Sequence, residues 1–213
     1  MTVSWIETTL VALSVALFAG YHLMLAREVR RNPERTASGL AHILRHAWVD
    51  SVIEDSRDMV VVHTLRNWIT ATSMLASSSI IVAIGLLSFL ISSNGVPTFL
   101  HRLNLLGSAS DAVFLSKVLL LTITFFANFM NFSWALRYYN HLTLELNVPP
   151  TRAPASQRRV CKAMIDRGAL HYTLGMRGLY AAILVTLWFF GPVWMLGGTV
   201  LMMGVLRWLD HVR

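Results

Sequence analysis

Seven polar side chains lie at the ends of long apolar runs, and side chains of these types can bind metal ions or anions. Imidazoles can ligate metals or haem, and guanidinium groups can hold anions. Side chains of these types are also common at membrane interfaces for structural reasons, so interface structure, an anion site and a metal or haem site all stay open. We expect them to converge in one polar site at the cytoplasmic end of the protein: His22, His63, Arg66, Asn67, Arg137, His141 and Arg177.

A second polar face lies inside an apolar run. Thr124, Asn128 and Asn131 are spaced by four and three residues, which places them on one side of a helix. Amide groups in lipid are costly unless they are paired, so this face should point into a helix bundle. Hydrogen bonding between helices is the favoured interpretation, and an intramembrane transport pathway is the alternative.

The sequence lacks the motifs of common soluble enzymes. It contains no phosphate-binding glycine loop, no CxxC pair, no HExxH and no GxSxG. The uncharged runs, the first of which begins at residue 8, contain no HxxxH or ExxH pair and no carboxylate that could relay protons. The one cysteine, Cys161, cannot form an intramolecular disulfide and is expected to be an inert thiol. We therefore expect no catalytic activity, no cofactor and no bound metal.

Membrane-spanning helices must position these side chains. Of the 213 residues, 55% are apolar and 14% are charged, whereas about 25% are charged in soluble proteins. A helix needs about 20 apolar residues to cross the hydrocarbon. We expect an all-α protein with a single membrane domain over residues 1–213 and four transmembrane helices, at about 4–26, 67–92, 112–138 and 178–207.

The basic residues that give the net charge of +7 lie between the apolar runs. Seven arginines occur between residues 27 and 66, and seven lysines or arginines occur between residues 137 and 177. The positive-inside rule places the loops at about 27–66 and 139–177 in the cytoplasm and both termini outside it. This pattern indicates a multi-pass protein of a bacterial inner membrane, with lipid headgroups rather than nucleic acid as partners.

The first basic loop contains a predicted amphipathic helix. Thr36 or Ser38 can cap it, and apolar residues then recur at helical spacing: Leu40, Ile43, Leu44, Ala47 and Trp48. His42, Arg45, His46 and Asp50 fall largely on the opposite face. We expect this helix to lie at the cytoplasmic surface of the membrane.

The fourth span contains Gly191-Pro192 near its middle. Proline removes a backbone donor and crowds the preceding turn, so the helix should kink or lose its hydrogen-bond ladder there. The kink could shape the bundle, or it could expose backbone groups to a substrate.

Five short blocks, in order along almost the whole chain, carry a family resemblance. They are Tyr21-His22; Asn32-Pro33-Glu34-Arg35-Thr36 with Gly39, Arg45 and Trp48; Thr64-Leu65-Arg66-Asn67 with Ser73 and Leu75-Ala76-Ser77; Arg137-Tyr138-Tyr139 with His141; and Leu174-Gly175-Met176-Arg177-Gly178 with Tyr180, Trp188 and Gly191-Pro192. In these blocks the chain resembles the membrane family called domain of unknown function 599, found in bacteria and plants. The resemblance implies a four-helix membrane protein and supplies no activity or cofactor.

The second span offers two faces of small polar residues, Ser73/Ser77 and Thr72/Ser79. A single bundle has less use for both, so we expect contact with another protein. The leading hypothesis is a non-enzymatic structural or accessory subunit that forms a homo-oligomer or assembles with other membrane proteins. A small oligomeric channel or transporter, using the Asn128–Asn131 face and the Gly191-Pro192 break, is the alternative. A membrane subunit with haem or metal held by histidines is a weaker one.

Overall fold

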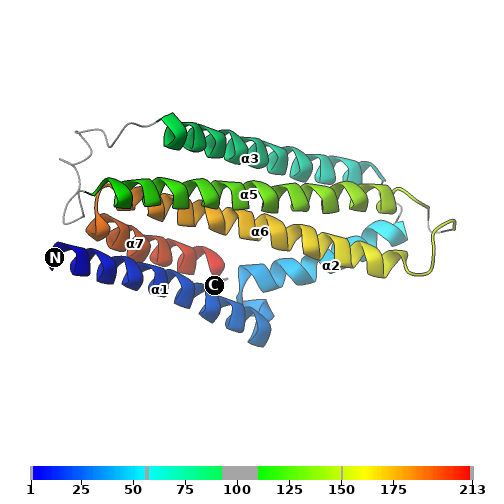
Figure 1. Cartoon of the computed structure of the whole chain (residues 1–213). Helices are drawn as coiled ribbons and strands as arrows, with labels where there is room; N and C mark the ends of the chain where they lie inside the picture. Colours follow the sequence, from blue (N-terminus) through cyan, green and yellow to red (C-terminus); the bar gives the residue numbers. More distant parts are fainter. Residues whose placement is uncertain (1, 56–57, 93–109, 150, 212–213) are drawn as a thin grey trace. The chain divides into compact units, whose positions relative to one another are not determined.

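The computed structural model describes residues 2–55, 58–92, 110–149 and 151–211, and helices account for most of them. The expected all-α class is confirmed. The elements are α1 (Thr2–Arg31), the short 3-10 helix η1 (Pro33–Arg35), α2 (Ala37–Asp55), α3 (Asp58–Ser92), α5 (Asp111–Leu146), α6 (Gln157–Phe189) and α7 (Pro192–Asp210), as labelled in Figure 1.

The helices form two compact units. Unit 1 contains residues 1–39, 81–125 and 178–213, and unit 2 contains residues 40–80 and 126–177. Helices α3, α5 and α6 each contribute residues to both units. The single domain over residues 1–213 stays a prediction.

In unit 1, α1 and α7 lie side by side. Tyr21, Leu25 and Leu206 form a buried cluster between them. The Tyr21 hydroxyl donates to the Asp210 carboxylate at 2.8 Å, which ties the second half of α1 to the last turn of α7. A second apolar cluster of Leu121, Ala182 and Val185 joins α5 to α6 within the same unit.

The predicted break at Gly191-Pro192 is a complete separation of two helices. Gly191 has φ 128°, a left-handed value that favours glycine, and Pro192 begins α7. A Cβ atom on Gly198 would overlap with the side chain of Leu187, so α7 packs closely back on the end of α6. Figure 1 shows α7 turning back beside α6. The sequence predicted one kinked span, and the chain instead forms a helical hairpin here.

This hairpin changes the number of candidate spans. Within the described residues, five helices are long and apolar enough to cross a membrane: 5–31, 61–92, 111–146, 157–189 and 192–210. The four expected spans correspond to five candidates because residues 178–207 belong to two antiparallel helices. The helices also extend further than expected, and α5 alone, with 36 residues, is about 54 Å long.

The C-terminal end of α7 lies beside the C-terminal end of α1. His211 pairs with the Glu28 carboxylate at 3.1 Å and forms an isolated β-bridge with Thr36. Helix α1, with 30 residues, is about 45 Å long, so its start lies far from this contact. If α1 and α7 each cross the bilayer, the two termini cannot share a side, in contrast to the expectation from sequence.

Unit 2 is built around a core shared by four helices. Its fully buried members include Val49 from α2, Leu65 from α3, Leu142 from α5 and Ile165 from α6. Most of the segments expected as basic loops, residues 27–66 and 139–177, are therefore helical. They are held by apolar packing, which stabilises helices more than intrinsic propensity does.

The amphipathic helix expected after Thr36 is present as α2. The Gly39 amide donates to the Thr36 hydroxyl oxygen at 3.2 Å, so Thr36 is the one of the two candidate caps, Thr36 and Ser38, that caps α2. Val49 is buried in the core of unit 2, whereas Ile43 and Leu44, from the predicted apolar face, are exposed. Contact of that exposed side with the membrane surface stays a prediction.

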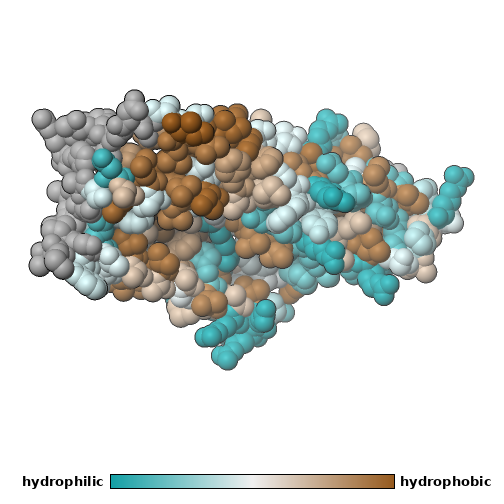
Figure 2. Space-filling view, in the orientation of Figure 1, coloured by the Kyte–Doolittle hydropathy of each residue, from teal (hydrophilic) through white to brown (hydrophobic). Residues whose placement is uncertain are grey.

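Figure 2 shows apolar surface over the C-terminal part of α3 and hydrophilic surface around the α1–α2 connection. The exposed apolar side chains on this part of α3 include Ile81, Ile84, Leu87 and Ile91. An exposed surface of this kind is suited to lipid or to another transmembrane helix.

Candidate functional site

The structure brings together only part of the predicted polar site. Within the described residues, no side-chain hydrogen bond or ion pair joins His63, Arg66, Asn67 or Arg177 to another member. His63, Arg66 and Asn67 are exposed on α3, and Arg177 is half-buried on α6. Convergence of all seven residues stays a prediction.

Arg137 and His141 do share a pocket, as their spacing on one helix predicts. The pocket is a shallow, open depression on one helix face, and its lining residues all come from α5: Ser133, Leu136, Arg137, Asn140, His141 and Leu144. Both side chains are exposed. The arrangement supplies a cation and an imidazole to solvent or to a lipid headgroup.

His22 belongs to unit 1, apart from the other predicted members, which are in unit 2. Its Nδ1 atom lies 2.8 Å from the carbonyl oxygen of Phe18, one turn earlier in α1. The imidazole also packs against the rings of Phe18 and Tyr21. These contacts describe a half-buried histidine tied to its own helix.

The second predicted face, Thr124, Asn128 and Asn131, makes one contact between helices. His171 Nδ1 on α6 donates to Asn131 Oδ1 on α5 at 3.1 Å. Thr124 bonds to the Leu120 carbonyl of its own helix. Asn128 is buried, and its side-chain nitrogen has no hydrogen-bond partner among the described residues. The Asn131–His171 bond fits the interhelical interpretation, whereas Asn128 leaves a donor unused.

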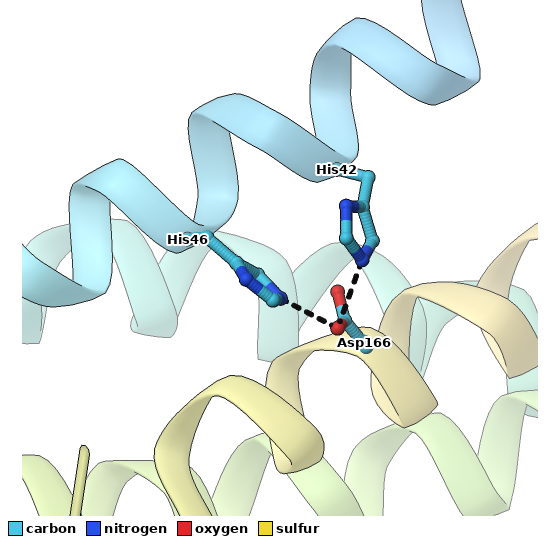
Figure 3. Close-up of side chains that lie close together, drawn as sticks. All are labelled: His42, His46 and Asp166. Carbon is cyan, nitrogen blue, oxygen red and sulfur yellow. Dashed lines mark hydrogen bonds and ion pairs between the residues drawn. The ribbon is translucent and has the colours of Figure 1, made fainter. Parts of the chain in front are cut away.

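A cluster that sequence analysis did not single out lies between α2 and α6 in unit 2. His46 Nε2 donates to Asp166 Oδ2 at 2.6 Å, and His42 Nε2 lies 3.2 Å from the same oxygen. Figure 3 shows both rings directed at this carboxylate. The three potential ligand atoms all lie within 4.8 Å of one another, which is compatible with a metal centre.

The contacts around this cluster repeat at intervals of four residues along two antiparallel helices. Lys162 Nζ donates to Asp50 Oδ2 at 2.7 Å, one turn beyond the His46–Asp166 pair. Arg158 Nη2 donates to Glu54 Oε1 at 3.0 Å, one turn further on. The polar face of α2 therefore matches residues 158–166 of α6 in register.

Asp50 titrates in this row of charges. The hydrogen bond from Lys162 lowers the pKa of Asp50 below its usual range, and the nearby charges of Lys162, Arg158 and His46 add to the effect. The Asp50 carboxylate is therefore stabilised in its ionised form.

One part of the cluster was visible in the sequence. His42 and His46 are four residues apart on a predicted helix, which places two imidazoles on one face. The apolar spans contain no HxxxH pair, and this pair lies outside them. Asp166 could not be assigned to it, because it is 120 residues from His46.

Another cluster that was not predicted is a buried ion pair in unit 1. Lys117 Nζ lies 3.1 Å from Glu7 Oε1 and donates to the Trp188 carbonyl oxygen at 3.2 Å. The indole of Trp188 donates to the same Glu7 oxygen at 2.9 Å. Three helices, α1, α5 and α6, are joined by this set of contacts just before the α6–α7 turn.

Comparison with known proteins identifies a family and no described activity. The family model described as protein of unknown function, DUF599, matches residues 9–213. No curated protein and no solved structure matches the chain.

Proposed function

We propose that this chain, which belongs to the DUF599 family, is a non-catalytic subunit that self-associates or assembles with other membrane proteins through the exposed face of α3. The single observation that carries the proposal is a row of small exposed residues along this helix. Ala71, Ser78, Gly85 and Ser92 recur at intervals of seven and are all exposed.

The opposite face of α3 is already used inside the chain. Thr72, Ala76, Ser79 and Ala83 are buried. Both hydroxyls on this inner face bond to carbonyl oxygens of α3 itself. Thr72 and Ser79, one of the two small faces expected from sequence, therefore lie on the buried side of α3. The row of small residues at intervals of seven lies on its exposed side.

Small side chains on a transmembrane helix let another helix approach closely, and close approach is a main source of association in lipid. Gly85 leaves open space, since no atom of the described residues lies within 4 Å of the position of an added Cβ atom. A spacing of seven residues keeps such a row facing one partner helix along its length. The chemistry of the face therefore suits a second transmembrane helix.

In this proposal the protein resides in the inner membrane with lipid as its surroundings, and nucleic acid is not a partner. The N-terminus lies outside, the helices alternate in direction, and the C-terminal end of α7 lies in the cytoplasm. Both basic segments are then cytoplasmic, and Arg207, in the last turn of α7, joins them.

Disulfide crosslinking in native membranes tests the use of this face. Ser78→Cys should form a disulfide-linked dimer, whereas Ile84→Cys should not. Ile84 is also exposed on α3, but it is rotated by about 120° from Ser78 at 100° per residue. Equal crosslinking of both variants, or crosslinking of Ile84→Cys alone, would exclude a symmetric contact through this face. In that case, we expect a photocrosslinker at position 78 to capture a different membrane protein. If no membrane protein is captured, the proposal is refuted.

A small oligomeric channel or transporter is the second candidate, and the buried amide of Asn128 favours it. An unpaired donor inside a membrane helix is costly unless water or a solute satisfies it. Flux of ions or small solutes into proteoliposomes, lost in Asn128→Leu, would support this function. Absence of flux for a broad panel would favour the subunit.

A further inference from the structure

The pair His42 and His46 and the facing Asp166 differ from the other polar contacts between α2 and α6. In the rest of the row, Lys162 and Arg158 contact different oxygens of Asp50, and Arg158 also contacts Glu54. Here, in contrast, two imidazoles share a single carboxylate oxygen. The two rings are 4.4 Å apart between centroids. One turn of helix thus presents two nitrogen donors to the same point, as a pair of metal ligands at positions i and i+4 does.

The distances are close to those that a metal ion requires. Zinc binds histidine nitrogen at about 2.0–2.1 Å and carboxylate oxygen at about 2.0–2.2 Å, so neighbouring ligands of a tetrahedral ion lie about 3.3 Å apart. The two nitrogens lie 2.6 Å and 3.2 Å from the Asp166 oxygen. Small side-chain rotations would therefore admit an ion among the three atoms.

The exposure of the three side chains leaves room for entry and for a further ligand. The side chains of His42, His46 and Asp166 are 52%, 32% and 28% exposed. An ion held by the three residues could keep a water molecule as its fourth ligand. The backbone around them is rigid, because α2 and α6 both contribute to the apolar core of unit 2.

Arg45 acts on the other oxygen of the carboxylate. Its Nε atom lies 3.8 Å from Asp166 Oδ1, and neither of these buried atoms has a hydrogen-bond partner in the part of the chain that the structure describes. A guanidinium group on this side orients the carboxylate so that Oδ2 faces the two histidines, a typical role for a residue around a metal centre. Its positive charge also weakens cation binding, so the site should hold the ion less tightly than a purely structural zinc site.

We infer that His42, His46 and Asp166 form a binding site for one divalent transition-metal ion, with zinc as the best match to two imidazoles and one carboxylate. The bound ion bridges α2 and α6. It replaces the protons that the Nε2 atoms share with Asp166, so its binding releases protons and strengthens with rising pH. The inference is independent of the contact face on α3.

Cobalt and zinc added to the full-length protein in detergent, after removal of metals with a chelator, provide the test. Co²⁺ in a tetrahedral site gives strong visible absorption, and Zn²⁺, which has a filled d shell, should abolish it by displacement at one ion per chain. The bound ion should also raise the unfolding temperature, because it binds the folded state. The absence of a cobalt band with wild-type protein would overturn the inference directly.

Four variants locate the site. His42→Gln, whose side chain is the most exposed of the three, and Asp166→Asn should each weaken Zn²⁺ binding at least tenfold and remove the zinc-induced rise in unfolding temperature. His63→Gln and His141→Gln change exposed histidines outside the cluster and should leave both properties unchanged. Zinc binding that survives in His42→Gln and Asp166→Asn, or is lost in His63→Gln or His141→Gln, would refute the assignment.

Discussion

The ammonium group of Lys117 lies 3.1 Å from the carboxylate of Glu7, and the two residues are only 3% and 5% exposed. Both lie within helices long and apolar enough to span the membrane. Lys117 also reaches the Trp188 carbonyl at the end of α6. The pair therefore links three helices next to the point where the chain reverses into α7.

Removal of one partner should be more damaging than removal of both. Lys117→Met or Glu7→Gln leaves an uncompensated charge or a lost donor in a buried place, and breaking a buried pair typically costs about 3–5 kcal/mol. The double variant should recover a substantial part of that loss. Unfolding of the purified proteins in mild detergent, arranged as a double-mutant cycle, measures the coupling. Additive effects would show that the pair does not stabilise the fold.

Gly175 should tolerate a methyl group poorly. A Cβ atom there would lie 2.6 Å from Cε1 of Phe132, whose ring is fully buried, so the ring must move. Overpacking of this kind typically costs about 1–3 kcal/mol. Gly197→Ala is the matched control, because nothing lies within 4 Å of the added atom and the residue is also inside a helix. Unfolding temperatures should fall for Gly175→Ala and stay level or rise for Gly197→Ala.

Acid should weaken the contact between α2 and α6. The pKa of Asp50 is lowered in the folded protein by its hydrogen bond from Lys162, so the folded state is stabilised at pH values above the unfolded carboxyl pKa, about 3.9. This stabilisation is lost as pH falls through the lowered folded value. The unfolding temperature of Asp50→Asn should therefore change less than that of wild type across this acid range. If the unfolding temperatures of wild type and Asp50→Asn changed equally with pH, the result would contradict a stabilising contact between Asp50 and Lys162.

The contact between His211 and Glu28 gives an expectation for topology. Reporters fused before α1 and after α7 should report opposite sides of the membrane, with the C-terminal fusion in the cytoplasm. The physical reason is that α7 runs beside α1 in the same direction in Figure 1 and is long and apolar enough to cross with it. Two fusions on the same side would show that α7 does not cross, and the number of spans would return to four.

Much of the helical architecture followed from the sequence, because long uncharged runs and proline have strong local effects. Gly191-Pro192 correctly predicted a disruption of the helix, but it was expected to kink a single span. It could not predict a reversal, since a kink and a hairpin have the same local signal and differ in packing, here that of Gly198 against Leu187. Thr36 was a correct cap for the same local reason.

The basic segments were harder to interpret. Their charges suggested loops, yet residues such as Val49, Leu142 and Ile165 bury a core that extends α5 and α6 through them. Contacts between residues far apart in the sequence could not be predicted either. The spacing of His42 and His46 was readable, but their contact with Asp166 depends on how α2 packs on α6.

Measurement of the mass of the protein in native-like lipid tests the central proposal of assembly most directly. The chain has a mass of 23.9 kDa. We predict a particle that contains at least two copies, or one copy with a stable membrane protein partner, and we predict that Gly85→Leu, which fills the open face of α3, reduces it to the single chain. A monodisperse single chain with no bound protein in wild-type samples would contradict the account.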